Sequence, residues 1–207
     1  LTATQLKGRA LDQEIAEDAY HTPYIRPLVQ PKFRREKKGL TPAERGTATH
    51  LVLQYLDLQN LDVPGQVEKL RLEAKLTAEQ AAAVDVPALR RFLESPLAEE
   101  MRQAETAARE YRFTVLMPAR DYDPAAAEED SILLQGVVDC WFETPEGVTV
   151  VDFKTDFVQT EEDVAQHAEL YRGQLAAYSL ALERVLERAV TRKALYFLQA
   201  GKTVEIS

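Results

Sequence analysis

The spacing of apolar and polar positions divides the chain into a helical first part and a strand-rich second part. Apolar side chains recur at helical spacing between residues 41 and 58 and in shorter segments between 66 and 105, which predicts several helices. A longer helical pattern occupies residues 161–189. After residue 105 the remaining apolar positions gather in short runs that favour strands, at 109–117, 132–142, 148–153, 194–199 and 203–206.

Capping and turn residues mark where several of these elements begin. The first of these helices opens with Thr41-Pro42-Ala43-Glu44, which combines an N-cap threonine, a proline at the first helical position and a glutamate three residues after the cap. Thr160 precedes a run of acidic residues and predicts the start of the long helix. Thr144-Pro145-Glu146-Gly147 is typical of a hairpin turn. The order of helices followed by β-β-β-α-β-β predicts an α/β fold, in which a mixed sheet is flanked by helices.

The first 40 residues have a different character. Residues 1–20 are compatible with a helix, whereas prolines at positions 23, 27 and 31 each bias the preceding residue away from helix, so residues 21–40 are predicted to be extended. We expect residues 1–40 together to be a strap or linker. It ends in a basic run that contains Lys32, Arg34, Arg35, Lys37 and Lys38. This run is either a solvated linker or a surface that contacts DNA or docks to another domain. The chain does not begin with methionine, and we expect it to be part of a longer polypeptide. Residues 41–207 would then form one domain, with a helical part at 41–105 and a core at 106–207.

Composition excludes several classes of protein. Apolar residues make up 45% and charged residues 29% of the chain, as in ordinary globular proteins. No apolar run approaches the roughly 20 residues of a membrane-spanning helix, and no signal peptide is visible, so we expect a cytoplasmic protein. A single cysteine, Cys140, excludes a disulfide framework, a cysteine-rich zinc site and an iron–sulfur cluster held by this chain. The net charge of −9 argues against a general nucleic-acid coat, but carboxylates that bind metal ions are compatible with action on DNA.

The strongest candidates for chemistry are Asp139, Asp152 and Lys154. Each aspartate ends an apolar run, where a carboxylate requires a metal ion, a cation or several hydrogen bonds. The predicted hairpin brings the two strands side by side, and Asp152 and Lys154 leave the same face of their strand. Two carboxylates and a lysine suit a divalent ion such as Mg²⁺ that activates water, with the lysine orienting that water or stabilising charge on a phosphate. A structural Asp–Lys pair at the sheet edge is the alternative, and these residues alone do not decide between the two.

Other residues could complete such a site. His50 lies on the helix that is predicted to begin after Thr41 and could supply a nitrogen ligand, although a lone helical histidine is more often structural. Gln174 and Tyr178 share one face of the long helix, where they either pack on the sheet or contact a phosphate backbone or the lysine. Glu110 opens the first strand and could be a third carboxylate facing the site. Trp141 is either a core residue or a wall on which a base stacks.

Four short motifs follow one another along the chain: Gly46-x-x-x-His50, Gly136-Val-Val-Asp139, Asp152-Phe-Lys154-Thr-Asp156 and Gln174-x-x-x-Tyr178. In order and spacing they resemble the motifs of the RecB-type nuclease domains of the PD-(D/E)xK superfamily. The amino-acid sequence around these motifs, over about residues 30–207, is similar to the C-terminal nuclease domains of AddA-type helicase–nucleases. The resemblance implies a restriction-endonuclease-like core with an N-terminal helical part.

The resemblance also implies a metal-dependent mechanism. His50, Asp139 and Asp152 would bind Mg²⁺, for which Mn²⁺ could substitute, and Lys154 would act on the attacking water. The implied activity is that of a DNA exonuclease within an ATP-dependent helicase–nuclease that processes double-strand DNA ends for recombinational repair.

The remaining motif residues and partners follow from the same resemblance. Gln174 and Tyr178 match a helix that this family associates with the active site and DNA, and Glu110 matches more loosely an acidic residue on the first core strand. The implied partners are DNA ends and single strands, an AddB-type protein in a heterodimer, and a helicase part of the same polypeptide, whose Walker motif these residues lack. The alternative is a domain that has lost catalysis and serves as a docking module, although both aspartates and the lysine are present.

Overall fold

The structure is a computed structural model that describes residues 39–121, 125–156, 158 and 160–206. The predicted strap, with the basic residues Lys32, Arg34, Arg35, Lys37 and Lys38, lies outside the described residues. The division of the chain at residue 40 therefore stays a prediction.

A group of helices precedes the first strand. These helices are α2 (Pro42–Tyr55), α3 (Val63–Leu72), α4 (Ala78–Ala83), α5 (Val86–Leu93) and α6 (Pro96–Gln103). An aspartate, serine or threonine side chain caps the first turn of each one. At α2, Oγ1 of Thr41 accepts a hydrogen bond from the Glu44 amide, and the Glu44 carboxylate accepts one from the Thr41 amide. This reciprocal capping box confirms the helix start that the sequence predicts.

The second part of the chain forms a five-stranded mixed sheet. Its elements are β1 (Ala107–Pro118), a short 3-10 helix (Ala119–Asp121), β2 (Ser131–Thr144), β3 (Gly147–Lys154), α7 (Glu161–Leu186), β4 (Val190–Phe197) and β5 (Lys202–Glu205). The strands lie in sequence order, and every neighbouring pair is antiparallel except β3 and β4. α7 connects those two parallel strands, which require a crossover connection of this kind. The predicted α/β fold, a mixed sheet flanked by helices, is thus confirmed.

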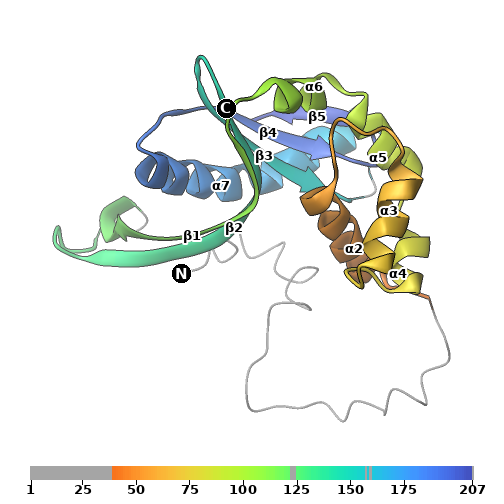
Figure 1. The fold of residues 1–207 in the computed structure, drawn as a ribbon. Coiled ribbons are helices and arrows are strands. Elements are labelled where there is room, and N and C mark those ends of the chain that lie inside the picture. The colour runs from red at the N-terminus through yellow and green to blue at the C-terminus, as the bar shows by residue number, and fades with distance from the viewer. Residues whose placement is uncertain (1–38, 122–124, 157, 159, 207) are drawn as a thin grey trace, which may run out of the picture.

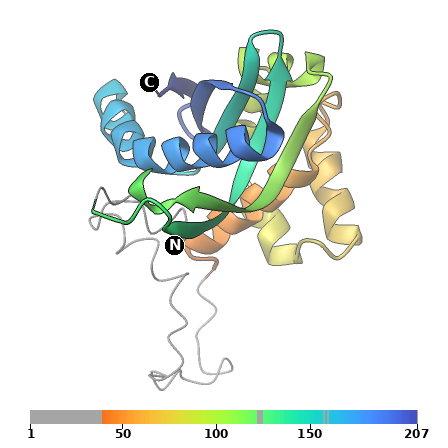
Figure 2. The same cartoon turned by 90° about the vertical axis from the view of Figure 1, so that its left-hand side faces the viewer.

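The sheet separates two apolar layers (Figures 1 and 2). α7 lies along one face, and the helices α2–α6 lie on the other. Successive side chains of a strand enter opposite layers, so Val151 and Phe153 pack beneath the helical group while Val150 packs against α7. Every residue of β3 is buried, which gives the side chains at its end a rigid support.

β2 has different neighbours along its length. It pairs with β1 from Ser131 to Phe142, but with β3 only from Thr144 back to Cys140. Beyond Cys140 the two strands separate, and β1 and β2 continue together as a two-stranded arm (Figure 1). We call the point of separation, at Asp139 on β2 and Asp152 on β3, the fork.

Several predicted boundaries differ by a few residues from those observed. α2 ends at Tyr55 instead of 58, and β4 already begins at Val190. α7 ends at Leu186 because Glu187 adopts a left-handed backbone with φ of 54°, which ends the helix. Among the described residues, no helix combines the length and the hydrophobicity needed to cross a membrane.

Candidate metal centre

The candidate residues meet at the fork. The last paired residues of β2 and β3 are Cys140 and Val151, so the next pair in register would be Asp139 opposite Asp152. In place of that pairing, Oδ2 of Asp139 accepts a hydrogen bond from the Phe153 amide at 2.8 Å. The carboxylate therefore satisfies a backbone group that the strand separation would otherwise leave unpaired, and it is fixed at the sheet by this bond.

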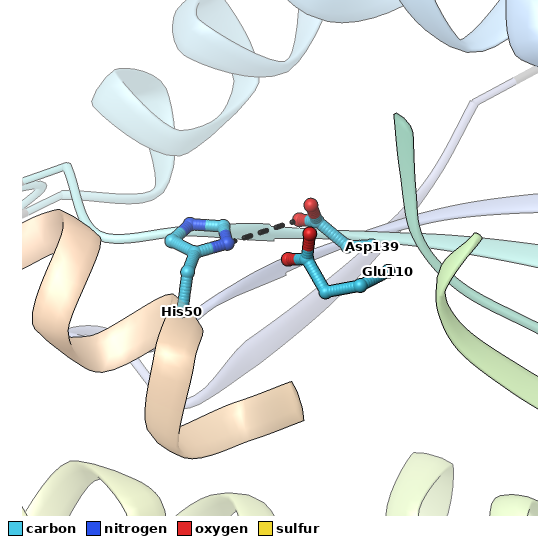
Figure 3. Close-up of side chains that lie close together, drawn as sticks. All are labelled: His50, Glu110 and Asp139. Atoms are coloured by element: carbon cyan, nitrogen blue, oxygen red, sulfur yellow. Dashed lines mark ion pairs between the residues drawn. The ribbon is translucent and has the colours of Figure 1, made fainter. Parts of the chain in front are cut away.

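A histidine and two carboxylates from three elements come together beside the fork (Figure 3). His50 from α2, Glu110 from β1 and Asp139 from β2 each offer one ligand atom, and these atoms lie within 4.8 Å of one another. Nδ1 of His50 lies 3.5 Å from Oδ2 of Asp139. Carboxylate oxygens suit Mg²⁺ and Mn²⁺, and imidazole suits first-row transition metals. The residues present therefore fit a divalent cation, and we call them the ligand trio.

Glu110 reaches the trio through an unusual backbone. The residues on either side of it pair with β2 one for one, which places Glu110 opposite Asp139. Its φ is 52°, in the left-handed region that residues other than glycine rarely adopt. Such a conformation costs roughly 1–3 kcal/mol and is concentrated at functional sites. The geometry thus groups Glu110, rather than Asp152, with His50 and Asp139.

A second group of polar side chains lies where β3 meets α7. Nζ of Lys154 is 2.5 Å from Oδ2 of Asp152. Gln174 accepts a hydrogen bond from Nζ of Lys154 at 3.4 Å and donates one to the Tyr178 hydroxyl at 2.6 Å. Of the interpretations that the sequence leaves open for Gln174, the structure therefore shows contact with the lysine. We call Asp152, Lys154, Gln174 and Tyr178 the lysine group.

Tyr171, which no sequence motif singles out, also contacts the lysine. Nζ of Lys154 lies 3.5 Å from the centroid of the Tyr171 ring, in a cation–π contact. The Tyr171 hydroxyl donates a hydrogen bond to Oδ2 of Asp156 at 3.1 Å. The available sequence signal is spacing, because Tyr171 precedes Gln174 by three residues and thus shares its helix face.

Asp139 and His50 stabilise each other's charged forms. Burial opposes ionisation of Asp139, but the contact with His50, the charge of Lys154 and the Phe153 amide outweigh it, so the pKa of Asp139 lies below its usual value. Burial likewise opposes protonation of His50, yet the nearby carboxylates Asp139 and Asp152 raise its pKa above the ordinary 6.5. In the metal-free protein this pair is therefore an imidazolium–carboxylate pair over a wider pH range than isolated groups would allow.

The other two carboxylates show the opposite shift. Burial is the largest influence on Asp152, and together with the charge of Asp139 it raises the pKa despite the contact with Lys154. Burial and the same neighbour also raise the pKa of Glu110. Carboxylates held this close oppose one another's ionisation, and a divalent cation would relieve that repulsion.

Two residues next to Asp139 lie in the core. Trp141 is buried in the layer beside α7, with its ring edge-to-face to Tyr111 at 5.8 Å. The structure thus supports the core interpretation of Trp141. Cys140 is buried beneath the helical group, and burial raises the pKa of its thiol to about 12, which leaves it unreactive at neutral pH.

Comparisons with known proteins show which family the chain is similar to. A family model described as the PD-(D/E)XK nuclease superfamily matches residues 19–205. A protein from Acetivibrio thermocellus, named as the A subunit of an ATP-dependent helicase/nuclease, is 38% identical over 208 residues, which cover 98% of this chain and 16% of the relative. Proteins of the same name from Ruminiclostridium cellulolyticum and Bacillus cytotoxicus are each 36% identical, over 94% and 92% of this chain and 16% and 17% of the relative. The chain therefore spans less than a fifth of the length of these relatives.

Proposed function

The chain belongs to the PD-(D/E)XK nuclease superfamily, and from this premise we propose that it is a Mg²⁺-dependent DNA exonuclease that hydrolyses phosphodiester bonds. One observation carries the proposal: the ligand trio and the lysine group adjoin each other at the fork. The trio fits a divalent cation, and the lysine group supplies a positive charge at a fixed place. Phosphodiester hydrolysis needs both a source of nucleophilic hydroxide and neutralisation of the phosphate.

We assign metal binding to the ligand trio, His50, Asp139 and Glu110, with Asp152 as the neighbouring carboxylate. A bound Mg²⁺ or Mn²⁺ would lower the pKa of a water molecule and reduce the charge on the phosphate. The surrounding residues of the chain fix the positions and charge states of the metal ligands. The Phe153 amide fixes the Asp139 carboxylate, and Asp139 in turn orients the His50 ring. Because its pKa is lowered, Asp139 is ionised at neutral pH and ready to bind a cation.

We assign Lys154 to the attacking water and the phosphate. Its ammonium carries three donors, and its polar partners among the described residues are Asp152 and Gln174. One donor is therefore available for a water molecule or a non-bridging phosphate oxygen. Gln174, itself bonded to Tyr178, and the Tyr171 ring restrict where the ammonium can lie.

The proposed substrates are DNA ends and single strands. The proposed setting is a longer, cytoplasmic helicase–nuclease that processes double-strand ends for repair in a heterodimer with an AddB-type protein. The names of the relatives support this setting. The DNA contacts that we propose are Lys32, Arg34, Arg35, Lys37 and Lys38. Because the chain carries a net charge of −9, binding should depend on this local run and should be weak and strongly salt-sensitive.

Cleavage of end-labelled single-stranded DNA tests the proposal. The proteins compared are the wild type, Asp152→Ala and the control Glu146→Ala, which changes an exposed carboxylate in the hairpin turn. We expect cleavage by the wild type and the control that requires Mg²⁺ or Mn²⁺ and stops with EDTA. Asp152→Ala should reduce the rate by at least about a hundredfold, since metal and charge stabilisation contribute several kcal/mol, while the melting temperature changes little.

Two outcomes would contradict parts of this account. Cleavage that survives in Asp152→Ala would remove the lysine group from the active site. A wild type that neither cleaves DNA nor binds Mg²⁺ in a calorimetric titration would contradict the nuclease and favour a docking module.

A further inference from the structure

The C-terminal end of α2 is capped by an arginine from another element. The last turn of α2 contains no basic residue of its own. Nη1 of Arg109, on β1, donates hydrogen bonds to the carbonyl oxygens of Leu53, at 2.9 Å, and of Leu56. Carbonyls in the last turn have no partner within the helix, and a positive charge there also interacts favourably with the helix dipole. β1 thus supplies the cap that α2 lacks.

The position of this arginine is unfavourable in other respects. Arg109 is only partly exposed to solvent, and Asp57 acts on it only through longer-range attraction. Among the described residues no carboxylate forms an ion pair with Arg109, so its partly buried charge depends on the two helix carbonyls. A solvent-exposed lysine or arginine within α2 would cap the helix without this desolvation. The arrangement therefore calls for a reason beyond capping.

Both ends of the contact lie next to residues of the ligand trio. Leu53 follows His50 by three residues, about 4.5 Å along the helix axis. On the other side, Arg109 directly precedes Glu110. The chain itself connects His50 to Glu110 only through the remaining helices, α3–α6. The two hydrogen bonds of Arg109 are thus a direct link between the element that carries the histidine and the strand that carries the glutamate.

We propose that Arg109 is a positioning residue of the metal centre, which sets the distance between His50 and the two carboxylates of the trio by fixing α2 on β1. It contacts neither a metal ion nor substrate. The inference rests on the proposed function in one respect, namely that the trio binds a divalent cation, and it adds a residue that lies outside all four sequence motifs.

A second arginine provides a matched control. Nη1 of Arg102, on α6, donates to the carbonyl oxygens of Leu58, at 3.1 Å, and Leu93, at 2.8 Å. Its side chain is only 16% exposed, and it ties the segment after α2 to the end of α5. Arg102 is therefore another partly buried arginine that bridges two backbone carbonyls, although it also pairs with Glu99, and neither end of its contact adjoins the trio.

Titration of the 207-residue chain with Mn²⁺, followed by the electron paramagnetic resonance of the free ion, tests the inference without DNA or turnover. Arg109→Met removes the donors and keeps the apolar stem. We expect its Mn²⁺ affinity to fall about tenfold, the lower end of losses for residues that support metal ligands. Arg102→Met should lower the melting temperature and keep the wild-type affinity. Arg109→Lys should fall between Arg109→Met and the wild type, because an ammonium keeps the charge but not the fixed geometry of the guanidinium.

Combining the Arg109 substitution with His50→Ala separates a positioning role from a general loss of stability. Because Arg109 acts through His50, Arg109→Met should change the Mn²⁺ affinity little further when His50→Ala is already present. If the two losses instead add in full, Arg109 does not act through His50 and the inference is overturned.

The remaining outcomes are equally decisive. If Arg109→Met does not fold, Arg109→Lys is judged by the same titration. Wild-type affinity in a folded Arg109 variant, or an equal loss of affinity in Arg102→Met, overturns the inference. A wild-type chain that binds no Mn²⁺ overturns the proposed function instead, so the two failures are distinguishable.

Discussion

Asp139 and Asp152 occupy equivalent places in the strand register but have opposite electrostatics. Each forms one ion-pair contact, Asp139 with His50 and Asp152 with Lys154. The side chains of the first pair are 15% and 30% exposed for Asp139 and His50, whereas those of Asp152 and Lys154 are 4% and 11% exposed. The pKa of Asp139 lies below its usual value and that of Asp152 above it.

The two residues are of the same type, so the difference in their pKa shifts comes from their local surroundings at the fork. Asp139 is stabilised as a carboxylate because the Phe153 amide donates to it in addition to the contact with His50. Asp152 lacks such an amide among the described contacts, and burial dominates its behaviour. Two carboxylates whose environments shift their pKa values in opposite directions are suited to different tasks. We therefore propose that the trio holds the cation and that the lysine group acts on the phosphate.

Removal of the lysine gives the largest expected effect. Lys154→Ala should reduce single-turnover cleavage by about a hundredfold or more, since a positive charge directed at the phosphate contributes several kcal/mol. Its Mn²⁺ affinity should stay at the wild-type value, and the exposed Lys69→Ala serves as the control. If Lys154→Ala loses metal affinity as well, the separation between the trio and the lysine group is wrong.

Removal of the histidine should weaken metal binding by the ligand trio. His50→Ala is expected to lower Mn²⁺ affinity about tenfold, because one ligand is lost while the carboxylates remain. The raised pKa of His50 adds a pH dependence: wild-type affinity should fall as the pH is lowered through a value above 6.5, where the imidazolium can no longer bind metal. This part of the pH dependence should disappear in His50→Ala. An unaltered titration would make His50 structural.

The tyrosine ring beneath the lysine should have a smaller effect. Tyr171→Leu removes the cation–π contact with Lys154 and should lower the cleavage rate about fivefold, in line with roughly 1 kcal/mol for such contacts. Tyr171→Phe keeps the ring and loses the hydrogen bond to Asp156, so most of the rate should remain. Equal losses of cleavage rate in the two variants would mean that the hydroxyl of Tyr171, and not its ring, supports Lys154.

Stability without metal should show the smallest difference, and it tests the electrostatics directly. Asp139 has a depressed pKa, so it stabilises the fold above its unfolded pKa, and this contribution is lost as the pH falls through the folded value. Asp152 has a raised pKa, so any stabilisation is present at low pH and is lost as the pH rises through the folded value. At pH 7 Asp139→Asn should therefore be roughly 1 kcal/mol less stable than Asp152→Asn in urea unfolding with EDTA. Equal stabilities of the two variants would contradict the opposite pKa shifts of Asp139 and Asp152.

Local signals were sufficient to predict the elements of the fold. The capping box at Thr41–Glu44 and the hairpin turn at Thr144–Gly147 depend on contacts within a few residues, and both are present in the structure. The fork depends on where β2 stops pairing with β3, which is a property of the whole sheet. No sequence pattern marks that point, although the sequence does indicate the two aspartates that lie there as candidates.

The candidate site was predictable only in part. The four motifs name His50, Asp139 and Lys154, but spacing along the chain does not fix the three-dimensional distances that group Glu110 with the first two. The sequence does mark Glu110 as a possible third carboxylate, but not the left-handed backbone through which it reaches the site, because that conformation is common for glycine and unusual for glutamate. Arg109 and Tyr171 act across elements, on a helix end and on a lysine, and such contacts become visible only when the elements are packed.

The most direct test of the central claim is the anomalous scattering of Mn²⁺ in a crystal of the wild-type chain. The account predicts one dominant peak at the fork, at coordination distance, roughly 2.0–2.3 Å, from a nitrogen of His50 and from carboxylate oxygens of Asp139 and Glu110. A saturated crystal with no peak there, or with its dominant peak away from these side chains, would contradict the assignment of the trio as the metal site.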